Sequence, residues 1–236
     1  MNSRFFTTRD ARNDNLLLPL HPAWWSRPYE YAWAGAFAEA GDTVLDAACG
    51  IEHPFKFYLL DHTREVHACD MEEGILVPDI IRQGLRNTYG EAAAASLPER
   101  YIRDIHFRRA SITDLPYTDG TFDKIFCVSV LEHLRDHFNR HLWIPRVGLL
   151  QSLLKREIFV ALREFRRSLK DDGLIVLTFD YPDINLDYLA SVVKSLGLAF
   201  AGQADFIRSA EALYAESLQL NCFRAVLKKA KKGPQP

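Results

Sequence analysis

The sequence predicts a doubly wound α/β fold, in which helices cover both faces of a parallel sheet. From residue 43 onward, short apolar runs alternate with helical patterns, the order that produces parallel strands joined by crossover helices. One of these runs, Thr43 to Cys49, ends in small residues and Gly50 just before a predicted helix at 55–60. Such a turn exposes backbone N–H groups beside a helix N-terminus, so we expect a ligand to bind there.

Length, composition and charge narrow the class of protein. A chain of 236 residues suits one α/β domain with room for an insertion. The net charge of −2 gives no general attraction to nucleic acid or to an anionic membrane, and no apolar run is long enough to span a bilayer. Residues 1–10 carry charges and lack the apolar stretch of a signal peptide. Four isolated cysteines, without Cys-x-x-Cys spacing, favour a reducing, cytoplasmic setting.

The first 40 residues are expected to form an N-terminal segment of their own, residues 1–40. Residues 1–20 are polar and irregular, so we expect them to be loosely held until Leu16-Leu17-Leu18. Residues 21–33 then concentrate three tryptophans, two tyrosines and an arginine. A helix is predicted from Tyr29 to Ala40, and its aromatic side either covers one end of the core or closes as a lid over a flat ligand. The sequence leaves both interpretations open.

The remaining chain alternates strands and helices without an internal repeat. Short apolar runs bounded by turn signals indicate the strands, as where Asp119-Gly120 precedes the run from Phe122. Strands are expected at residues 43–49, 65–70, 105–111, 122–130 and 174–180, with further apolar runs at 198–201 and 220–227. Helices are expected at residues 55–60, 74–89, 91–96, 135–170 and 185–196.

An acidic residue closes the second expected strand. The carboxylate of Asp70 can accept hydrogen bonds from both hydroxyls of a ribose, as in dinucleotide-binding folds. A dinucleotide site also needs Gly-x-Gly-x-x-Gly to accommodate pyrophosphate, but Gly50 is the sole glycine of this turn, and Glu52 would repel the phosphates. The sequence therefore favours a nucleoside without phosphates.

With these residues, the chain resembles the class I S-adenosylmethionine-dependent methyltransferases. Its motifs follow the order of that family over roughly residues 40–180, and several motifs in order are more specific than one alone. The matching motifs are Val44-Leu-Asp-Ala-Ala-Cys-Gly50, Asp70, Ser111-Ile-Thr-Asp-Leu-Pro-Tyr-Thr-Asp-Gly-Thr-Phe-Asp123, Ile125-Phe-Cys-Val-Ser-Val-Leu-Glu-His-Leu134 and Arg163-Glu-Phe-Arg-Arg-Ser-Leu-Lys-Asp-Asp-Gly-Leu-Ile-Val176.

The resemblance implies a Rossmann-like sandwich with a mostly parallel seven-stranded sheet, whose last strand is antiparallel. It implies a methyltransferase domain at residues 41–236, S-adenosyl-L-methionine as cofactor, and methyl transfer to an oxygen, nitrogen or carbon of a small molecule. In the implied site, Asp46 organises the turn and Asp70 holds the ribose. The other implied cofactor-binding residues are Ala48, Cys49 and Gly50 at the methionine end, Met71 along the adenine, Ser111, Ile112 or Asp114 at the adenine amine, and Ser129 near the sulfonium. A cap over the site is expected from Trp24, Trp25, Arg27, Tyr29 and Tyr31.

The cofactor turn also departs from the family pattern. Its first glycine position falls on Ala47 or Ala48, and its last glycine is replaced within Glu52-His53-Pro54. One alternative is therefore a non-catalytic module that has kept the fold and lost the cofactor. A nicotinamide-dependent oxidoreductase is the other alternative, although the missing glycines and Glu52 disfavour it.

The stretch after the fourth strand leaves further questions open. His133 could serve as a base for an acceptor that must lose a proton, but a histidine that caps a helix fits the motif better. His133, His137 and His141 would share a helix face, yet no fourth ligand is evident, so no metal is predicted. An apparent helical insertion around residues 135–160 is unusually apolar at 141–154, and could cap an acceptor pocket or form a homodimer contact.

Overall fold

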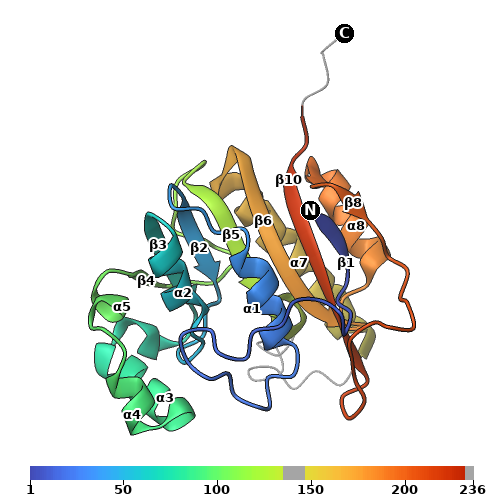
Figure 1. Cartoon of the computed structure of the whole chain (residues 1–236). Coiled ribbons are helices and arrows are strands. Elements are labelled where there is room, and N and C mark those ends of the chain that lie inside the picture. Colours follow the sequence, from blue (N-terminus) through green and yellow to red (C-terminus); the bar gives the residue numbers. More distant parts are fainter. Residues whose placement is uncertain (135–146, 232–236) are drawn as a thin grey trace.

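A computed structural model describes residues 1–134 and 147–231 of the chain (Figure 1). Within these residues the strands form a single sheet in the order β4-β3-β2-β5-β6-β10-β1-β8, and β7 and β9 also pair with β10. The strands are β1 (Asn2–Phe5), β2 (Thr43–Ala47), β3 (Glu65–Asp70), β4 (His106–Arg109), β5 (Phe122–Val128), β6 (Leu169–Tyr181), β7 (Leu198–Phe200), β8 (Gln203–Ala204), β9 (Tyr214–Ala215) and β10 (Leu220–Lys229).

The half of the sheet from β4 to β6 is parallel, as predicted. Strand β2 lies between β3 and β5 and pairs in parallel with both, so its carboxyl end opens between theirs. Strand order reverses at β2, because β3 and β4 lie on one side of it and β5 and β6 on the other. Such a switch point is where an α/β sheet forms its ligand crevice.

Helices lie on both faces of the sheet, with α1 and α2 in front of it and α7 behind it in the view of Figure 1. The helices are α1 (Arg27–Gly35), α2 (Phe55–His62), α3 (Pro78–Tyr89), α4 (Glu91–Ala95), α5 (Arg100–Arg103), α7 (Val147–Ser168) and α8 (Leu186–Ser195), with 3-10 turns η1 (Glu73–Leu76) and η2 (Leu131–His133). None of the described helices is both long and apolar enough to cross a membrane.

Alternate side chains of the strands supply two separate cores. Leu45 and Ile125 face the layer of α7 and α8, whereas Val44 and Phe126 face α1 and α2. This alternation follows from the two-residue period of a strand, and it makes every residue of β2 buried. The doubly wound sandwich predicted from the sequence is therefore confirmed.

The amino-terminal residues are not loosely held, which corrects the expectation for the residues before Leu16. Asn2–Phe5 form β1, which pairs antiparallel with β10 through Arg4↔Arg224 and Phe5↔Phe223. Phe6 is fully buried. This strand could not be predicted from the sequence, because its partner lies more than 200 residues away and polar residues surround it.

The number and limits of the strands differ from the expectation. The described residues contribute ten strands instead of seven, since the short strands β1, β8 and β9 join the sheet. Strand β6 begins at Leu169 and not at 174, with an irregular register opposite Phe122 and Lys124. Gly173 allows this irregularity, because a Cβ there would lie 2.7 Å from the carbonyl oxygen of Asp123.

Two other predictions meet the structure only in part. Helix α1 ends at Gly35, five residues before the predicted end at Ala40. Of the insertion predicted around residues 135–160, residues 135–146 lie outside the described part, as do His137 and His141. The homodimer contact and the division of the chain at residue 40 stay predictions.

Candidate cofactor site

The turn after β2 has the backbone conformation of a glycine motif although it contains one glycine. Ala48 and Gly50 both have positive φ, 56° and 60°. The first glycine position of the motif is therefore Ala48, which settles the choice between Ala47 and Ala48. An alanine in the left-handed region costs roughly 1–2 kcal/mol, so the surrounding contacts must hold this turn in place.

Asp70 supplies one of these contacts. Its Oδ2 accepts a hydrogen bond from the backbone N–H of Gly50 at 2.9 Å, and its Oδ1 accepts one from the N–H of Glu72 at 3.0 Å. Each carboxylate oxygen can accept a second hydrogen bond. The carboxylate therefore joins the turn to the end of β3 and retains capacity to accept ribose hydroxyls.

Lys56 supplies the other contact, which the sequence analysis did not find. This side chain on α2 is fully buried, and its Nζ donates to the carbonyl oxygens of Gly50 at 2.7 Å and His53 at 2.6 Å. The carboxylate of Asp46, expected to organise the turn, makes no hydrogen bond to it within the described residues. Lys56 and Asp70 organise the turn instead, from its two ends.

His53 stands in the part of the turn where the family's last glycine is replaced. Its ring stacks on Trp24 with centroids 4.2 Å apart, and its Nδ1 lies 2.8 Å from the hydroxyl oxygen of Tyr31. Burial, together with the charges of Arg27 and Lys56, holds the pKa of His53 well below its usual value. The ring is therefore neutral at neutral pH, and it connects the turn to the aromatic segment before α1.

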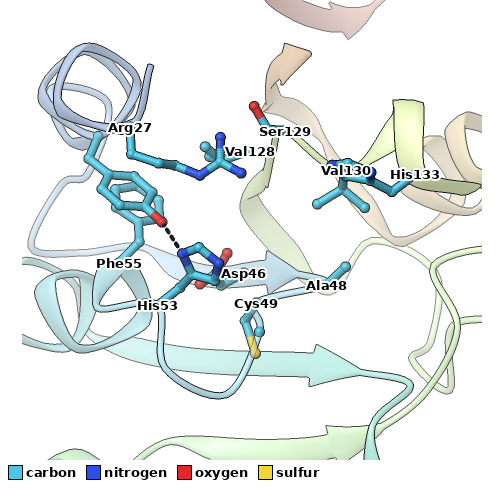
Figure 2. A pocket seen from close by; sticks show the side chains of 12 residues that line it. Arg27, Asp46, Ala48, Cys49, His53, Phe55, Val128, Ser129, Val130 and His133 are labelled. Carbon is cyan, nitrogen blue, oxygen red and sulfur yellow. Dashed lines mark hydrogen bonds between the residues drawn. The ribbon is translucent and has the colours of Figure 1, made fainter. Parts of the chain in front are cut away.

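A cavity of about 260 Å³ opens at the carboxyl ends of β2 and β5 (Figure 2). It brings together six of the twelve residues predicted for the site. These are Asp46, Ala48, Cys49, Gly50, Ser129 and His133. The walls also contain Arg27 and Tyr31, which were expected in the cap, together with His53, Phe55, Val128 and Val130.

A buried ion pair forms the wall opposite the turn. Figure 2 shows Arg27 reaching from α1 towards Val128 and Ser129. Its guanidinium donates to Oε2 of Glu30 at 2.6 Å, and Oε1 of Glu30 accepts from the hydroxyl of Ser129 at 2.6 Å. Burial raises the pKa of Glu30, but Arg27 and these hydrogen bonds outweigh it, so the carboxyl titrates below its usual range. Helix α1 is thereby fastened to the end of β5.

The carboxyl group of Asp46 at the floor of the cavity is unusually basic. Burial raises its pKa to about 7, with Lys56 opposing the rise and Asp70 adding to it. Asp46 can therefore change its protonation state near neutral pH, beside the turn.

Comparison with known proteins identifies the family. Residues 45–143 match the model of the family described as a methyltransferase domain. The chain therefore contains a methyltransferase domain, and this match supports its identification as a class I S-adenosylmethionine-dependent methyltransferase. No curated protein sequence matches the chain significantly.

Solved structures with the same fold include several methyltransferases. One is a TehB-like S-adenosylmethionine-dependent methyltransferase from Corynebacterium glutamicum, at 17% identity and a TM-score of 0.51, covering 85% of this chain and 86% of that one. Another is the 1,6-didemethyltoxoflavin-N1-methyltransferase of Burkholderia thailandensis, at 14% identity and a TM-score of 0.52, covering 88% and 81%. The [4+2]-cyclase SpnF also matches, at 12% identity and a TM-score of 0.56, covering 94% and 87%. At these identities the similarity shows the fold alone.

The turn after β2 suits S-adenosylmethionine, the cofactor of the methyltransferase. S-adenosylmethionine is a phosphate-free nucleoside with a cationic sulfonium, so Glu52 does not exclude it. Ala48, Cys49 and Gly50 of the turn line the cavity, and Asp70 has free acceptor capacity for ribose. Arg27 lines the far wall of the cavity, where a carboxylate could pair with it.

The expected adenine end of the methyltransferase site is more open. Met71 is 44% exposed and follows Asp70 directly. The hydroxyl of Ser111 is 2.7 Å from that of Thr113, Asp114 is exposed, and Ile112 is buried in the core with its side chain 3% exposed. Ile112 can therefore contact adenine only through its backbone or a small part of its side chain.

Tyr29 does not belong to the cavity, which corrects its expected role. Its ring is buried with Phe6, Leu213 and Cys222 in a small core of its own. Tyr31, two residues further along α1, lines the cavity instead. The reason is helical geometry, since residues two apart face different sides of a helix.

A pair of buried acids behind the site gives the methyltransferase a testable pH dependence. Burial and the Asp180 carboxylate raise the pKa of Glu132 to about 8, and burial together with Glu30 raises that of Asp180 to about 6. One oxygen of each, Oε2 of Glu132 and Oδ1 of Asp180, is buried without a partner among the described residues. Between about pH 4.5 and 8 the folded state binds more protons here than the unfolded chain, so stability falls as pH rises.

Replacement Glu132→Gln should remove much of the loss of stability that occurs as pH rises. The amide oxygen can keep the hydrogen bond that Glu132 accepts from the Asp180 N–H at 3.1 Å. We expect the free energy of unfolding, measured in urea from pH 5 to 8, to fall less steeply with pH, by up to about 1.4 kcal/mol per pH unit. The exposed Glu73→Gln should keep the wild-type slope. Parallel curves for Glu132→Gln and wild type would refute the assignment.

Proposed function

We propose that this enzyme transfers the methyl group of S-adenosylmethionine to an oxygen, nitrogen or carbon atom of a small molecule. The walls of the cavity support a small acceptor, because apolar and aromatic side chains line it together with a few polar groups. The 1,6-didemethyltoxoflavin-N1-methyltransferase, which shares the fold, is described with a small molecule and S-adenosylhomocysteine bound. That description concerns the other protein, but it supports the same class of acceptor here.

The residues of the site have distinct roles in this proposal. The cofactor supplies an activated methyl group on a sulfonium. Asp70 holds the ribose, the turn from Ala48 to Gly50 lies against the methionine end, and the Arg27 guanidinium pairs with a carboxylate in the cavity. Ser129, with φ of 46° at the end of β5, shapes the opposite wall. Because the leaving group is already activated, these residues accelerate transfer mainly by aligning the acceptor.

His133 stands at the rim of the cavity and is exposed. Its place on η2 suits a contact with the acceptor, and a base there would help where the acceptor must lose a proton. We assign it to acceptor binding and, where the acceptor must lose a proton, to the removal of that proton. The buried, unpaired thiols of all four cysteines support a reducing, cytoplasmic location.

The single observation that carries the proposal is the turn held between Asp70 and Lys56 at the mouth of the cavity. The test has two stages. Calorimetry should first detect binding of S-adenosylhomocysteine and none of NAD. Cell extract divided by size should then be incubated with the protein and methyl-labelled cofactor.

We expect the label to appear in the low-mass fraction. Label in the protein or nucleic-acid fraction would reject the small-molecule acceptor while keeping methyl transfer. A failure to bind any nucleoside would favour the non-catalytic alternative.

A further inference from the structure

We propose that Glu65, His67 and His106 bind a divalent transition-metal ion, with Zn²⁺ as the preferred ion. The three residues lie on β3 and β4, at the edge of the sheet. Glu65 begins β3 and Asp70 ends it, which separates this group from the cofactor site by about 16 Å at about 3.3 Å per residue. The proposed site is therefore independent of the methyl-transfer chemistry.

The spacing of the ligand atoms fits a metal. Oε1 of Glu65 lies 3.2 Å from Nε2 of His67 and 3.4 Å from Nε2 of His106. Bonds of 2.0–2.1 Å to a tetrahedral Zn²⁺ place neighbouring ligand atoms about 3.3 Å apart. All three ligand atoms lie within 4.8 Å of one another. The side chain of His106 is 56% exposed, so its ring has room to turn and bring its ligand atom closer to the other two.

The sheet itself brings the two histidines together. His67 and His106 are direct partners in the parallel register of β3 and β4, and their rings stack with centroids 4.8 Å apart. Two imidazoles and one carboxylate form a donor set typical of zinc sites that leave a fourth position to water. The exposed side of His106 gives an ion and its water access from solvent.

Neighbouring groups hold two of the ligands in position. The Thr43 hydroxyl donates to Oε2 of Glu65 at 3.2 Å, which leaves Oε1 directed at the histidines. The ring of His67 is fixed between the edges of Tyr117 and Phe122, each with a centroid 5.4 Å away. Outer contacts of this kind orient metal ligands.

Two buried polar atoms at this group of residues lack hydrogen-bond partners. Nδ1 of His67 and the hydroxyl of Tyr117 are buried and have no hydrogen-bond partner among the described residues. Coordination through Nε2 would place the proton of His67 on Nδ1. The positive charge of the Arg108 guanidinium repels a cation at this site, so we expect moderate affinity for the metal ion.

Calorimetric titration of chelator-treated, tag-free protein with Zn²⁺ tests the proposal. We expect one ion per chain, and at least a tenfold loss of affinity in His106→Ala and in Glu65→Gln. His106 is exposed, so its replacement should leave the fold intact, which circular dichroism checks. His62→Ala, an exposed histidine on α2, is the matched control and should bind as wild type.

The absorption spectrum of bound Co²⁺ distinguishes binding at this site from binding at the four buried cysteines. Co²⁺ bound by two imidazoles and a carboxylate gives visible d–d bands without thiolate-to-metal charge transfer, and we expect this spectrum to be lost in His106→Ala. A thiolate band, or Zn²⁺ affinity that is the same in wild type, His106→Ala and Glu65→Gln, would overturn the proposal, as would the absence of binding at millimolar Zn²⁺.

Discussion

Replacement of Asp70 by alanine should weaken binding of S-adenosylhomocysteine by about 100-fold or more. Two hydrogen bonds between a carboxylate and ribose hydroxyls contribute about 1.5–3 kcal/mol each, and every 1.4 kcal/mol is a factor of ten. The substitution also leaves the N–H groups of Gly50 and Glu72 without their acceptor, so the turn loses its connection to β3. Calorimetry on the folded variant measures the loss.

The design of this experiment separates the charge from the shape of the side chain. Asp70→Asn keeps an acceptor oxygen for one contact, and it should bind more weakly than wild type but more tightly than Asp70→Ala. Asp79→Ala removes a carboxylate that is 92% exposed on the neighbouring helix, and should bind normally. Unchanged affinity in Asp70→Ala would show that the ribose lies elsewhere.

Replacement of Lys56 by methionine should damage both stability and cofactor binding. It leaves the carbonyl oxygens of Gly50 and His53 buried without a donor, at about 1–3 kcal/mol each. It also removes the positive charge that opposes the rise in the pKa of Asp46. We expect the free energy of unfolding to fall by about 2–5 kcal/mol and the affinity for S-adenosylhomocysteine to fall at least tenfold.

Binding must be measured at a temperature where the variant is folded, as urea titration can establish. The exposed Lys194→Met on α8 is the matched control and should change neither quantity. Lys56→Arg keeps a donor and a charge, so partial recovery of affinity is expected. Loss of stability with full affinity would limit Lys56 to a structural role.

The parts of the site that could be predicted are those encoded locally. Val44 to Gly50 combines a buried strand with small residues, and Asp70 follows at the end of the next strand, so both signals lie in short stretches of sequence. The order of elements then places the two strands side by side. For this reason the turn, the ribose acid and the end of β5 at Ser129 were predicted near one another, and the structure brings them together.

The parts that could not be predicted depend on contacts between distant residues. Lys56 sits on a short helix, where a lysine normally indicates a solvent-facing position, and only the fold shows that Nζ enters the turn. The carboxylate of Glu30 accepts a hydrogen bond from the hydroxyl of Ser129, which lies 99 positions further along the chain. The spacing of Arg27 and Glu30, three residues apart on a helix, is the one local signal that could have indicated their ion pair.

The similarity to solved structures does not by itself identify the reaction that this protein catalyses. A [4+2]-cyclase shares the fold with the methyltransferases, so the sheet order by itself does not determine the reaction. In this chain the family match over residues 45–143 covers the turn, Asp70 and the end of β5. The reaction is therefore assigned from this segment and not from the overall architecture.

The pairing of β1 with β10 has a consequence for the order of folding. Ser3 is fully buried, and its Oγ accepts a hydrogen bond from the N–H of Val226. During synthesis, β1 leaves the ribosome long before β10 and must therefore wait for this partner. The parallel half from β2 to β6 can form earlier, because its strands pair with nearer neighbours. Until β10 arrives, the antiparallel edge of β6 and the apolar side chains of Phe5 and Phe6 stay uncovered, so this is the stage at which a nascent chain most needs protection from aggregation.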